Sequence, residues 1–140
     1  IQKRFIGHSV SSDGGQEYVI FRHITEYPLG VQEASITFVV RFKFARLSHR
    51  ANKIASIIPM LLITGFPGFQ TKMYAVNKKN GFWQGMYQWK NPQYLEEYLQ
   101  SFVYNMMNKR AIKETIHSVK IQNQPLTDFI HKNKIIDKKF

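Results

Sequence analysis

Cysteine is absent from this chain of 140 residues, and the 9 acidic residues are few beside 20 lysines and arginines. Without thiolates, the sequence excludes disulfide frameworks, thiol nucleophiles and metal sites with cysteine ligands. Long apolar runs are also missing. The most apolar stretch, Ile54–Phe66, is interrupted by Pro59 and Gly65 and is shorter than the roughly twenty residues of a membrane helix. No secretory signal is visible, so we expect a cytoplasmic protein without a membrane partner.

The excess of basic residues gives a formal net charge of +11 and a sequence pI near 10.0. Clustered lysine and arginine displace counterions from phosphates, so this charge is compatible with a nucleic acid or an acidic membrane as a partner. The basic residues form loose groups at 41–53, 109–113 and 132–139, without a block of five in a row. This spacing favours a solvated basic surface over a polyanion site.

Length and composition indicate one folded domain with an addition at each end. Hydrophobic residues make up 44% of the chain and aromatic residues 14%, which is not the composition of a disordered protein. The turn sequence at 11–15 predicts a hairpin within an N-terminal extension, residues 1–35. Residues 36–124 form the predicted domain. Pro125 ends its last strand, and we expect residues 125–140 to be a polar, basic tail.

Hydrophobic periodicity predicts four strands and two helices within the domain. Pro59 lacks an amide hydrogen, so we expect the first helix to kink or end near Ile58. Asn91 and Pro92 have the chemistry of an N-cap and a first helical residue, and therefore mark the start of the second helix. The predicted elements are, in order, a strand at 36–44, a helix at 48–58, strands at 69–76 and 82–89, a helix at 92–110 and a strand at 116–122.

This β-α-β-β-α-β order predicts an α+β fold, namely a ferredoxin-like sheet with both helices on one face. The opposite face of the four-stranded sheet would expose apolar side chains of the strands. An exposed apolar face of that kind indicates a partner.

Two motifs in the second half of the domain resemble those of a known superfamily. Residues 65–72 read Gly-Phe-Pro-Gly-Phe-Gln-Thr-Lys, and residues 85–89 read Gly-Met-Tyr-Gln-Trp ahead of an amphipathic helix. Together they resemble the dimeric α/β-barrel superfamily, and within it the small proposed monooxygenases grouped with the antibiotic-biosynthesis monooxygenases. The resemblance covers residues 30–122. It implies a homodimer whose two sheets pack face to face into a barrel, with a pocket in each subunit between sheet and helices.

The resemblance also implies a range of chemistries. The superfamily includes cofactor-independent oxygenases of quinol substrates and haem-degrading enzymes. The haem degraders need a histidine on the second helix, and residues 94–110 contain none. The implied function is therefore a cofactor-independent monooxygenase, or a binder of a flat aromatic or hydrophobic small molecule, with no cofactor. A fold that supports many chemistries does not specify a reaction.

Few residues are candidates for chemistry. The five histidines lack metal-ligand spacing, so we expect no metal site. His49 lies near the expected pocket rim and titrates in the range suited to proton transfer. Lys72 is the second candidate catalytic residue. Aromatic residues at this spacing also suit an ordinary core, which is the alternative interpretation. The candidate substrate-binding residues are aromatic or basic: Arg41, Tyr74, Trp83, Tyr87, Trp89, Tyr98 and Phe102.

An RNA-binding module is the alternative function, because RNA-recognition motifs share the same element order and the net charge of +11 fits one. Their third strand needs a small residue followed by an aromatic residue. Here Trp83 occupies the small position and Gln84 the aromatic position. Base-specific stacking is therefore disfavoured, whereas binding of nucleic acid through charge alone stays open.

Overall fold

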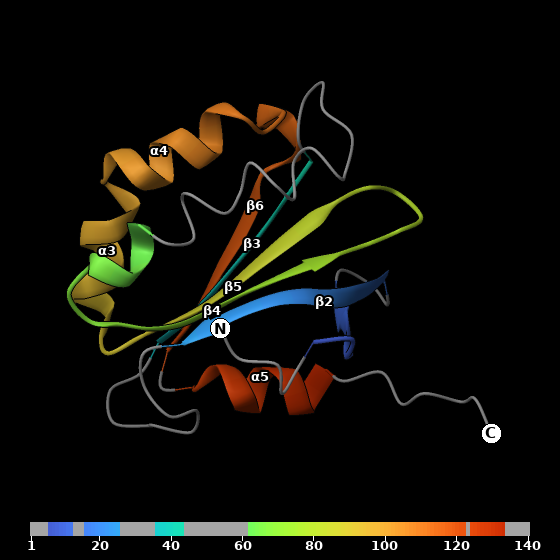
Figure 1. The fold of residues 1–140 in the computed structure, drawn as a ribbon, viewed down its shortest axis with the longest axis horizontal. Coiled ribbons are helices and arrows are strands. Elements are labelled where there is room, and N and C mark those ends of the chain that lie inside the picture. The colour runs from blue at the N-terminus through green and yellow to red at the C-terminus, as the bar shows by residue number, and fades with distance from the viewer. Residues whose placement is uncertain (1–5, 13–15, 26–35, 44–61, 123, 134–140) are drawn as a thin grey trace.

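The computed structural model describes residues 6–12, 16–25, 36–43, 62–122 and 124–133. Within these residues, six strands form one sheet with helices on both of its faces (Figure 1). The elements are β1 (Ser9–Ser12), β2 (Gln16–Thr25), β3 (Ile36–Phe42), η1 (Ile63–Gly65), β4 (Phe69–Val76), β5 (Trp83–Trp89), α3 (Pro92–Leu99), α4 (Phe102–Lys109), η2 (Lys113–Thr115), β6 (His117–Gln122) and α5 (Leu126–Asn133).

The sheet is antiparallel throughout, with the strand order β1-β2-β4-β5-β3-β6. Its last four positions hold the four predicted strands in the ferredoxin-like arrangement. The first predicted strand, β3, lies between the third and the fourth, β5 and β6. The structure therefore confirms the predicted α+β, ferredoxin-like fold.

The N-terminal hairpin extends the sheet beyond β4. Strand β1 pairs with β2 from Ser9↔Val19 to Ser12↔Gln16, which confirms the hairpin predicted from the turn at 11–15. Strand β2 in turn pairs with β4, from Val19↔Val76 to Thr25↔Thr71. The hairpin thus bonds backbone groups that an unpaired β4 would expose at the sheet edge.

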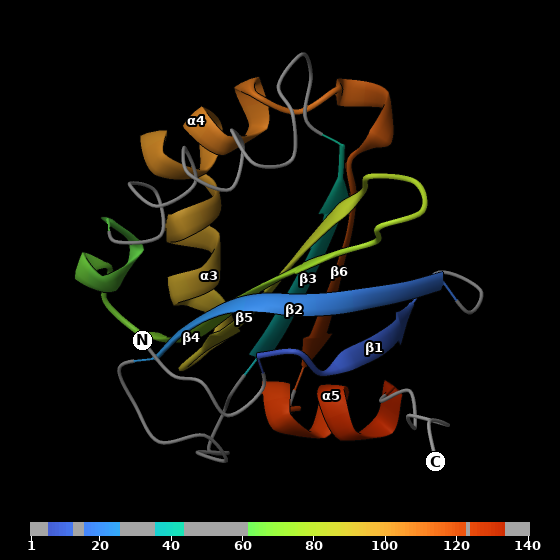
Figure 2. The same ribbon diagram turned by 45° about the vertical axis from the view of Figure 1, so that its right-hand side comes forward.

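The two faces of the sheet bury separate apolar clusters. Alternate residues of each strand point to opposite sides, so Tyr74 and Tyr87 lie in the larger cluster, beneath α3 and α4. Met73 and Met86 lie in the smaller cluster, which packs against α5. Figure 2 shows α3 and α4 on one side of the sheet and α5 on the other. We call these sides the α3/α4 face and the α5 face.

The predicted second helix consists of two helices that meet at Ser101. Asn91 Oδ1 accepts a hydrogen bond from the Tyr94 amide at 3.1 Å, as expected of an N-cap. Ser101 Oγ caps α4 by accepting from the Tyr104 amide at 3.3 Å. A serine that bonds the local backbone in this way competes with continuation of a helix. The predicted first helix, 48–58, lies outside the described residues.

Helix α5 lies where the sequence predicts a polar tail. Leu126, Phe129 and Ile130 have the i, i+3, i+4 spacing of a short apolar stripe, and Leu126 and Ile130 are buried. The Leu126 amide donates to Gln88 Oε1 at 2.7 Å, which joins the helix to β5. The stripe is short and polar residues surround it, so periodicity alone is a weak signal here. Among the described helices, none is both long and apolar enough to cross a membrane.

Candidate active site

A buried lysine lies between two tyrosine rings on the α3/α4 face. Lys72 of β4 pairs with Tyr87 of β5. Lys72 Nζ is 4.4 Å from the ring centroid of Tyr74 and 4.7 Å from that of Tyr87. Gly85, which pairs with Tyr74, keeps space beside these rings, because a Cβ there would lie 3.0 Å from Tyr87 Cε1. The strand register therefore places one amine against two aromatic faces.

The surroundings of Lys72 disfavour its charged form. The side chain is 0% exposed, and Nζ has no hydrogen-bond partner among the described residues. Burial lowers the pKa of Lys72 well below its ordinary range, and the Arg22 guanidinium lowers this pKa further. The contacts with the ring faces partly offset the loss of hydration. At a given pH, Lys72 therefore has a larger fraction of neutral amine than an exposed lysine, and the neutral amine is the form that accepts a proton.

The tyrosines near Lys72 are held as protonated phenols. Tyr87 Oη and Tyr98 Oη are 3.5 Å apart, and Tyr74 Oη donates to Met107 Sδ at 3.6 Å. Burial raises the pKa of Tyr74, Tyr87 and Tyr98 above the ordinary value. These hydroxyls can therefore donate hydrogen bonds, whereas Lys72 is the group able to accept a proton.

Both tryptophans of the chain lie in this cluster. The ring centroids of Trp83 and Tyr74 are 5.3 Å apart, and those of Trp89 and Tyr98 are 5.0 Å apart. Trp89 Nε1 is buried and has no hydrogen-bond partner in the described part of the chain. Buried polar groups are normally paired, so the unpaired indole N–H and lysine amine depart from the usual pattern of a core. We call the following residues the Lys72 cluster: Lys72, Tyr74, Trp83, Tyr87, Trp89 and Tyr98.

The structure separates two other predicted site residues, Arg41 and Phe102, from this cluster. Arg41 pairs with Gln84 and lines a small pocket together with Val39, which packs on the α5 face. Strand alternation therefore places Arg41 and Lys72 on opposite sides of the sheet. Phe102 is 70% exposed on α4, outside the aromatic cluster. His49 lies outside the described residues.

Sequence reasoning missed two residues of the N-terminal hairpin. Arg22 pairs with Tyr74 across β2 and β4, and its charge contributes to the lowered pKa of Lys72. The Phe21 ring stacks on Tyr74 at 6.2 Å and meets Trp83 edge-on at 4.9 Å. A register shift between positions 20 and 22 interrupts strand alternation, so periodicity could not assign the faces of these residues.

No protein-family model matches the sequence, and no curated protein matches it. Solved structures do match. A heme-degrading enzyme from Listeria monocytogenes is 13% identical, with a TM-score of 0.57 over 89% of this chain and 88% of that chain. A ferredoxin-fold protein from Listeria monocytogenes 4b, related to antibiotic biosynthesis monooxygenases, is 13% identical, with a TM-score of 0.54 over 79% and 66%. A major regulator of staphylococcal pathogenesis is 14% identical, with a TM-score of 0.59 over 81% and 71%.

The chain spans about half the length of two further matched structures. These are proposed monooxygenases from Fusobacterium nucleatum and Lactobacillus acidophilus, and 51% of each is covered. TM-scores of 0.53 and 0.54 at identities of 11% and 12% show a common fold alone, and a common fold leaves the reaction open.

Haem is the substrate named for one of these structures, and the resemblance implies a histidine on the second helix for its degradation. Helices α3 and α4 contain no histidine. The buried His23 pairs with Met73 of the α5 face, and its Nε2 is 2.9 Å from Thr71 Oγ1. Within the described residues, no group of three or more His, Asp or Glu side chains is placed to hold a metal ion. The chain shares the ferredoxin-like fold of proposed monooxygenases related to the antibiotic-biosynthesis monooxygenases.

Proposed function

We propose that this chain is a cofactor-independent monooxygenase of a flat aromatic substrate, with Lys72 as the base. The Lys72 amine is the observation that supports this most directly. It lies between the rings of Tyr74 and Tyr87 with no hydrogen-bond partner among the described residues. Lysines with strongly lowered pKa values concentrate at functional sites. The fold shared with proposed monooxygenases supports the same reaction class.

The proposed reaction begins with proton transfer. The neutral Lys72 amine takes a proton from an activated methylene group of the substrate, and the resulting ammonium stabilises the carbanion. The carbanion then reduces dioxygen. Overall, the methylene becomes a carbonyl, one oxygen atom enters the product and the other leaves as water. The aromatic side chains of the Lys72 cluster pack against the flat substrate, while the hydroxyls of Tyr87 and Tyr98 donate to its anionic oxygen.

The two tryptophans allow binding and turnover to be measured separately. Since both lie in the Lys72 cluster, an aromatic ligand bound there changes their fluorescence, while an oxygen electrode measures turnover of polycyclic phenols that carry an activated methylene group. We expect Lys72→Met to retain binding and to lose turnover by about 100-fold or more. Lys90→Met, at an exposed lysine just after β5, is the matched control and should behave as wild type.

Other outcomes separate the alternatives. Full turnover by Lys72→Met contradicts the role of Lys72 as base. Binding without turnover in the wild type indicates a protein that only binds an aromatic small molecule. His49→Ala tests the other predicted catalytic residue, and unchanged turnover removes it from the proposal.

The proposal includes assembly of the chain into a homodimer. Helix α5 packs on β1, β3 and β5 of the α5 face, and Val119 on β6 is 47% exposed. Pairing of two chains through this face would pack α5 against the partner or displace it. Light scattering at low and at high salt should give twice 16.5 kDa at both. A monomer under both conditions contradicts pairing.

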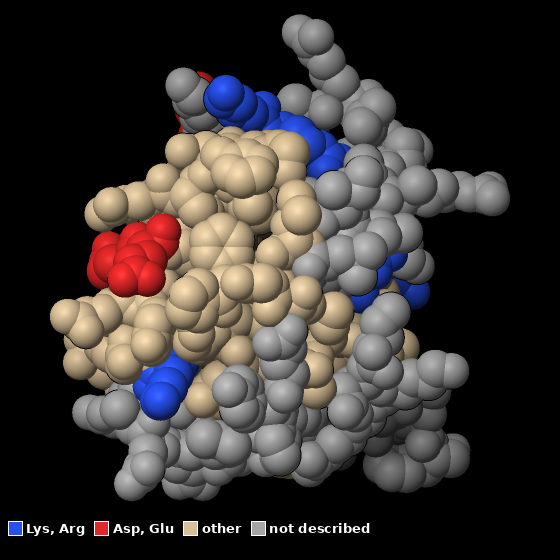
Figure 3. All heavy atoms as spheres, turned by 60° about the vertical axis from the view of Figure 1, so that its left-hand side comes forward, with Lys and Arg blue, Asp and Glu red and all other residues tan. Residues whose placement is uncertain are grey.

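One arrangement supports nucleic-acid binding as a second candidate. The Ile112 amide, after α4, donates to the Lys43 carbonyl at 2.8 Å. A Cβ on Gly81, in the β4–β5 hairpin, would lie 3.7 Å from Lys43 Cε. Exposed lysines of three segments, including Lys79 and Lys109, therefore lie toward one end of the molecule. Figure 3 shows a row of lysine and arginine along the upper edge, with smaller basic groups at the lower left and at the right.

Charge-driven binding has a clear signature. Affinity for single-stranded RNA should fall by about 10-fold or more between 50 and 200 mM salt if several phosphates are contacted. Lys78→Glu combined with Lys79→Glu should weaken this binding. No detectable binding at low salt contradicts this second function.

A further inference from the structure

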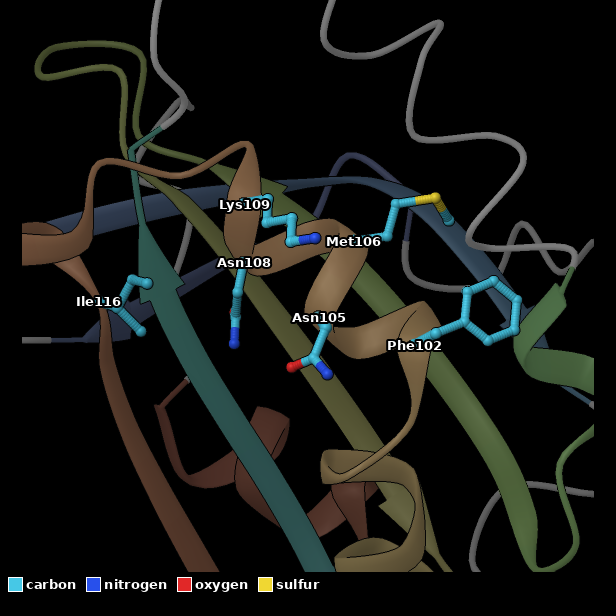
Figure 4. A pocket seen from close by; sticks show the side chains of 6 residues that line it. All are labelled: Phe102, Asn105, Met106, Asn108, Lys109 and Ile116. Carbon is cyan, nitrogen blue, oxygen red and sulfur yellow. The ribbon is translucent and has the colours of Figure 1, made fainter.

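The outward face of α4 is a second candidate site, separate from the Lys72 cluster. Phe102, Asn105, Met106 and Lys109 follow the i, i+3, i+4, i+7 spacing that places residues on one helix face. With Asn108 and Ile116 they line an open pocket of about 620 Å³. Figure 4 shows these side chains around α4, with Ile116 on one side and Phe102 and Met106 on the other.

Packing of the core does not account for this face. Helix α4 directs Val103 and Met107 into the α3/α4 cluster, so Phe102 contributes little to the core. Its 70% exposure is the largest among the exposed large hydrophobic side chains of the described residues. Apolar groups grouped around a surface hollow are typical of a binding site.

The polar residues of the pocket indicate the charge of its ligand. Lys109 is exposed and forms no salt bridge with a described acidic residue. Asn105 adds an amide that can donate a hydrogen bond, and no acidic residue is among the six that line the pocket. Figure 3 shows this side as largely uncharged, with lysine and arginine at its upper edge and one patch of acidic residues at its left. This combination of apolar walls with one cation is complementary to a molecule that is apolar at one end and anionic at the other.

We propose that this pocket binds a small amphipathic carboxylate. The apolar body packs against Phe102, Met106 and Ile116, and the carboxylate lies at Lys109 with Asn105 as an additional donor. A volume of about 620 Å³ is within the range of small-molecule sites. This site differs from the Lys72 cluster in position and in ligand, so the proposal does not depend on the proposed monooxygenase activity.

Calorimetric titration with decanoate tests the proposal, with decanol as the neutral analogue of similar size. Both are used well below the concentrations at which they aggregate. We expect saturable binding of decanoate and weaker binding of decanol. Lys109→Gln should weaken decanoate binding by about 2- to 5-fold, the usual effect of a solvent-exposed ion pair, and leave decanol binding unchanged. Phe102→Ala should weaken the binding of both ligands.

Controls on α5 and β6 match the two variants. Lys132→Gln removes an exposed charge on α5, and Val119→Ser removes an exposed apolar side chain on β6, so both should bind as wild type does. Since Lys109 and Phe102 are exposed, their variants should fold, which circular dichroism checks. The proposal is overturned if decanoate does not bind saturably, if decanol binds equally well, or if neither pocket variant changes binding. It is also overturned if light scattering shows self-association that Phe102→Ala abolishes, because the pocket would then contact a second copy of the chain.

Discussion

Replacing Lys72 by methionine should abolish a specific pH dependence of stability. In the unfolded chain a lysine titrates near pH 10.4, whereas burial lowers the pKa of Lys72 well below this in the folded protein. Between these two pKa values the unfolded chain binds a proton that the folded chain does not. The free energy of unfolding therefore decreases as the pH falls, by about 1.4 kcal/mol per pH unit. Above the unfolded pKa, Lys72 is neutral in both states and this titration does not reduce the free energy of unfolding. Below the folded pKa, the reduction has reached its full size.

Urea unfolding, followed by tryptophan fluorescence between pH 7 and pH 9.5, measures this effect. The upper limit of pH 9.5 avoids the ionisation of tyrosine. Burial raises the pKa of Tyr74 and Tyr87 in the folded protein, so near pH 10 their phenols ionise only in the unfolded chain, which lowers stability for a different reason. The difference in unfolding free energy between Lys72→Met and wild type cancels groups common to both. This difference should increase in favour of the variant by about 1.4 kcal/mol for each unit of decreasing pH, until the folded pKa is passed.

The methionine variant should also be the more stable protein at pH 7. It fills a similar volume without leaving a buried polar atom unpaired, which costs about 1–3 kcal/mol. Lys90→Met, at an exposed position, should give a curve parallel to that of wild type. A curve for Lys72→Met that is also parallel to wild type would refute the reasoning, because Lys72 would then titrate alike in the folded and unfolded chain.

Three further predictions concern stability and can be checked by urea unfolding. Gly68→Ala should destabilise the protein by about 2 kcal/mol or more, since Gly68 has φ +78° and a Cβ would lie 2.2 Å from Tyr94 Cδ2; an unchanged midpoint would show that Tyr94 moves aside at no cost. Ser101→Ala should lower the free energy of unfolding by about 1 kcal/mol, because α4 loses its cap. Glu96→Gln removes an exposed salt bridge to Lys120 and should lower the free energy of unfolding by less than about 1 kcal/mol. Ile130→Ala should cost about 2–5 kcal/mol and increase hydrogen exchange in α5 more than in α3; equal increases would show that α5 does not loosen separately.

Several elements could be predicted because their signals are local. The strand at 69–76 has the predicted bounds, since the turn sequences at 65–68 and 77–81 that flank it are local signals. The adjoining hairpin turn contains Gly81 at φ +78°, a conformation that glycine adopts without strain. Asn91 caps α3 through a bond to an amide three residues away. Order and spacing of these elements were enough to predict the ferredoxin-like sheet.

The tertiary structure decided on which face of the sheet each side chain lies and which residues it contacts. The composition of the Lys72 cluster follows partly from alternation, which placed Trp83, Tyr87 and Trp89 together. The exclusion of Arg41 follows from its pairing with Gln84, and the position of Arg22 beside the cluster follows from its pairing with Tyr74. Such pairings join residues distant in the chain, and a shift of one residue in register would reverse the face of each side chain.

The sequence by itself determined where chain segments extend, turn or begin a helix, because those preferences arise from neighbouring residues. Only the tertiary structure decided that α5 packs on the sheet, since its stripe of Leu126 and Ile130 is buried by strands whose own positions depend on the whole sheet. The same holds for Lys72. Its sequence position gives a strand residue on a known face, but the burial that lowers its pKa comes from elements spread across the chain.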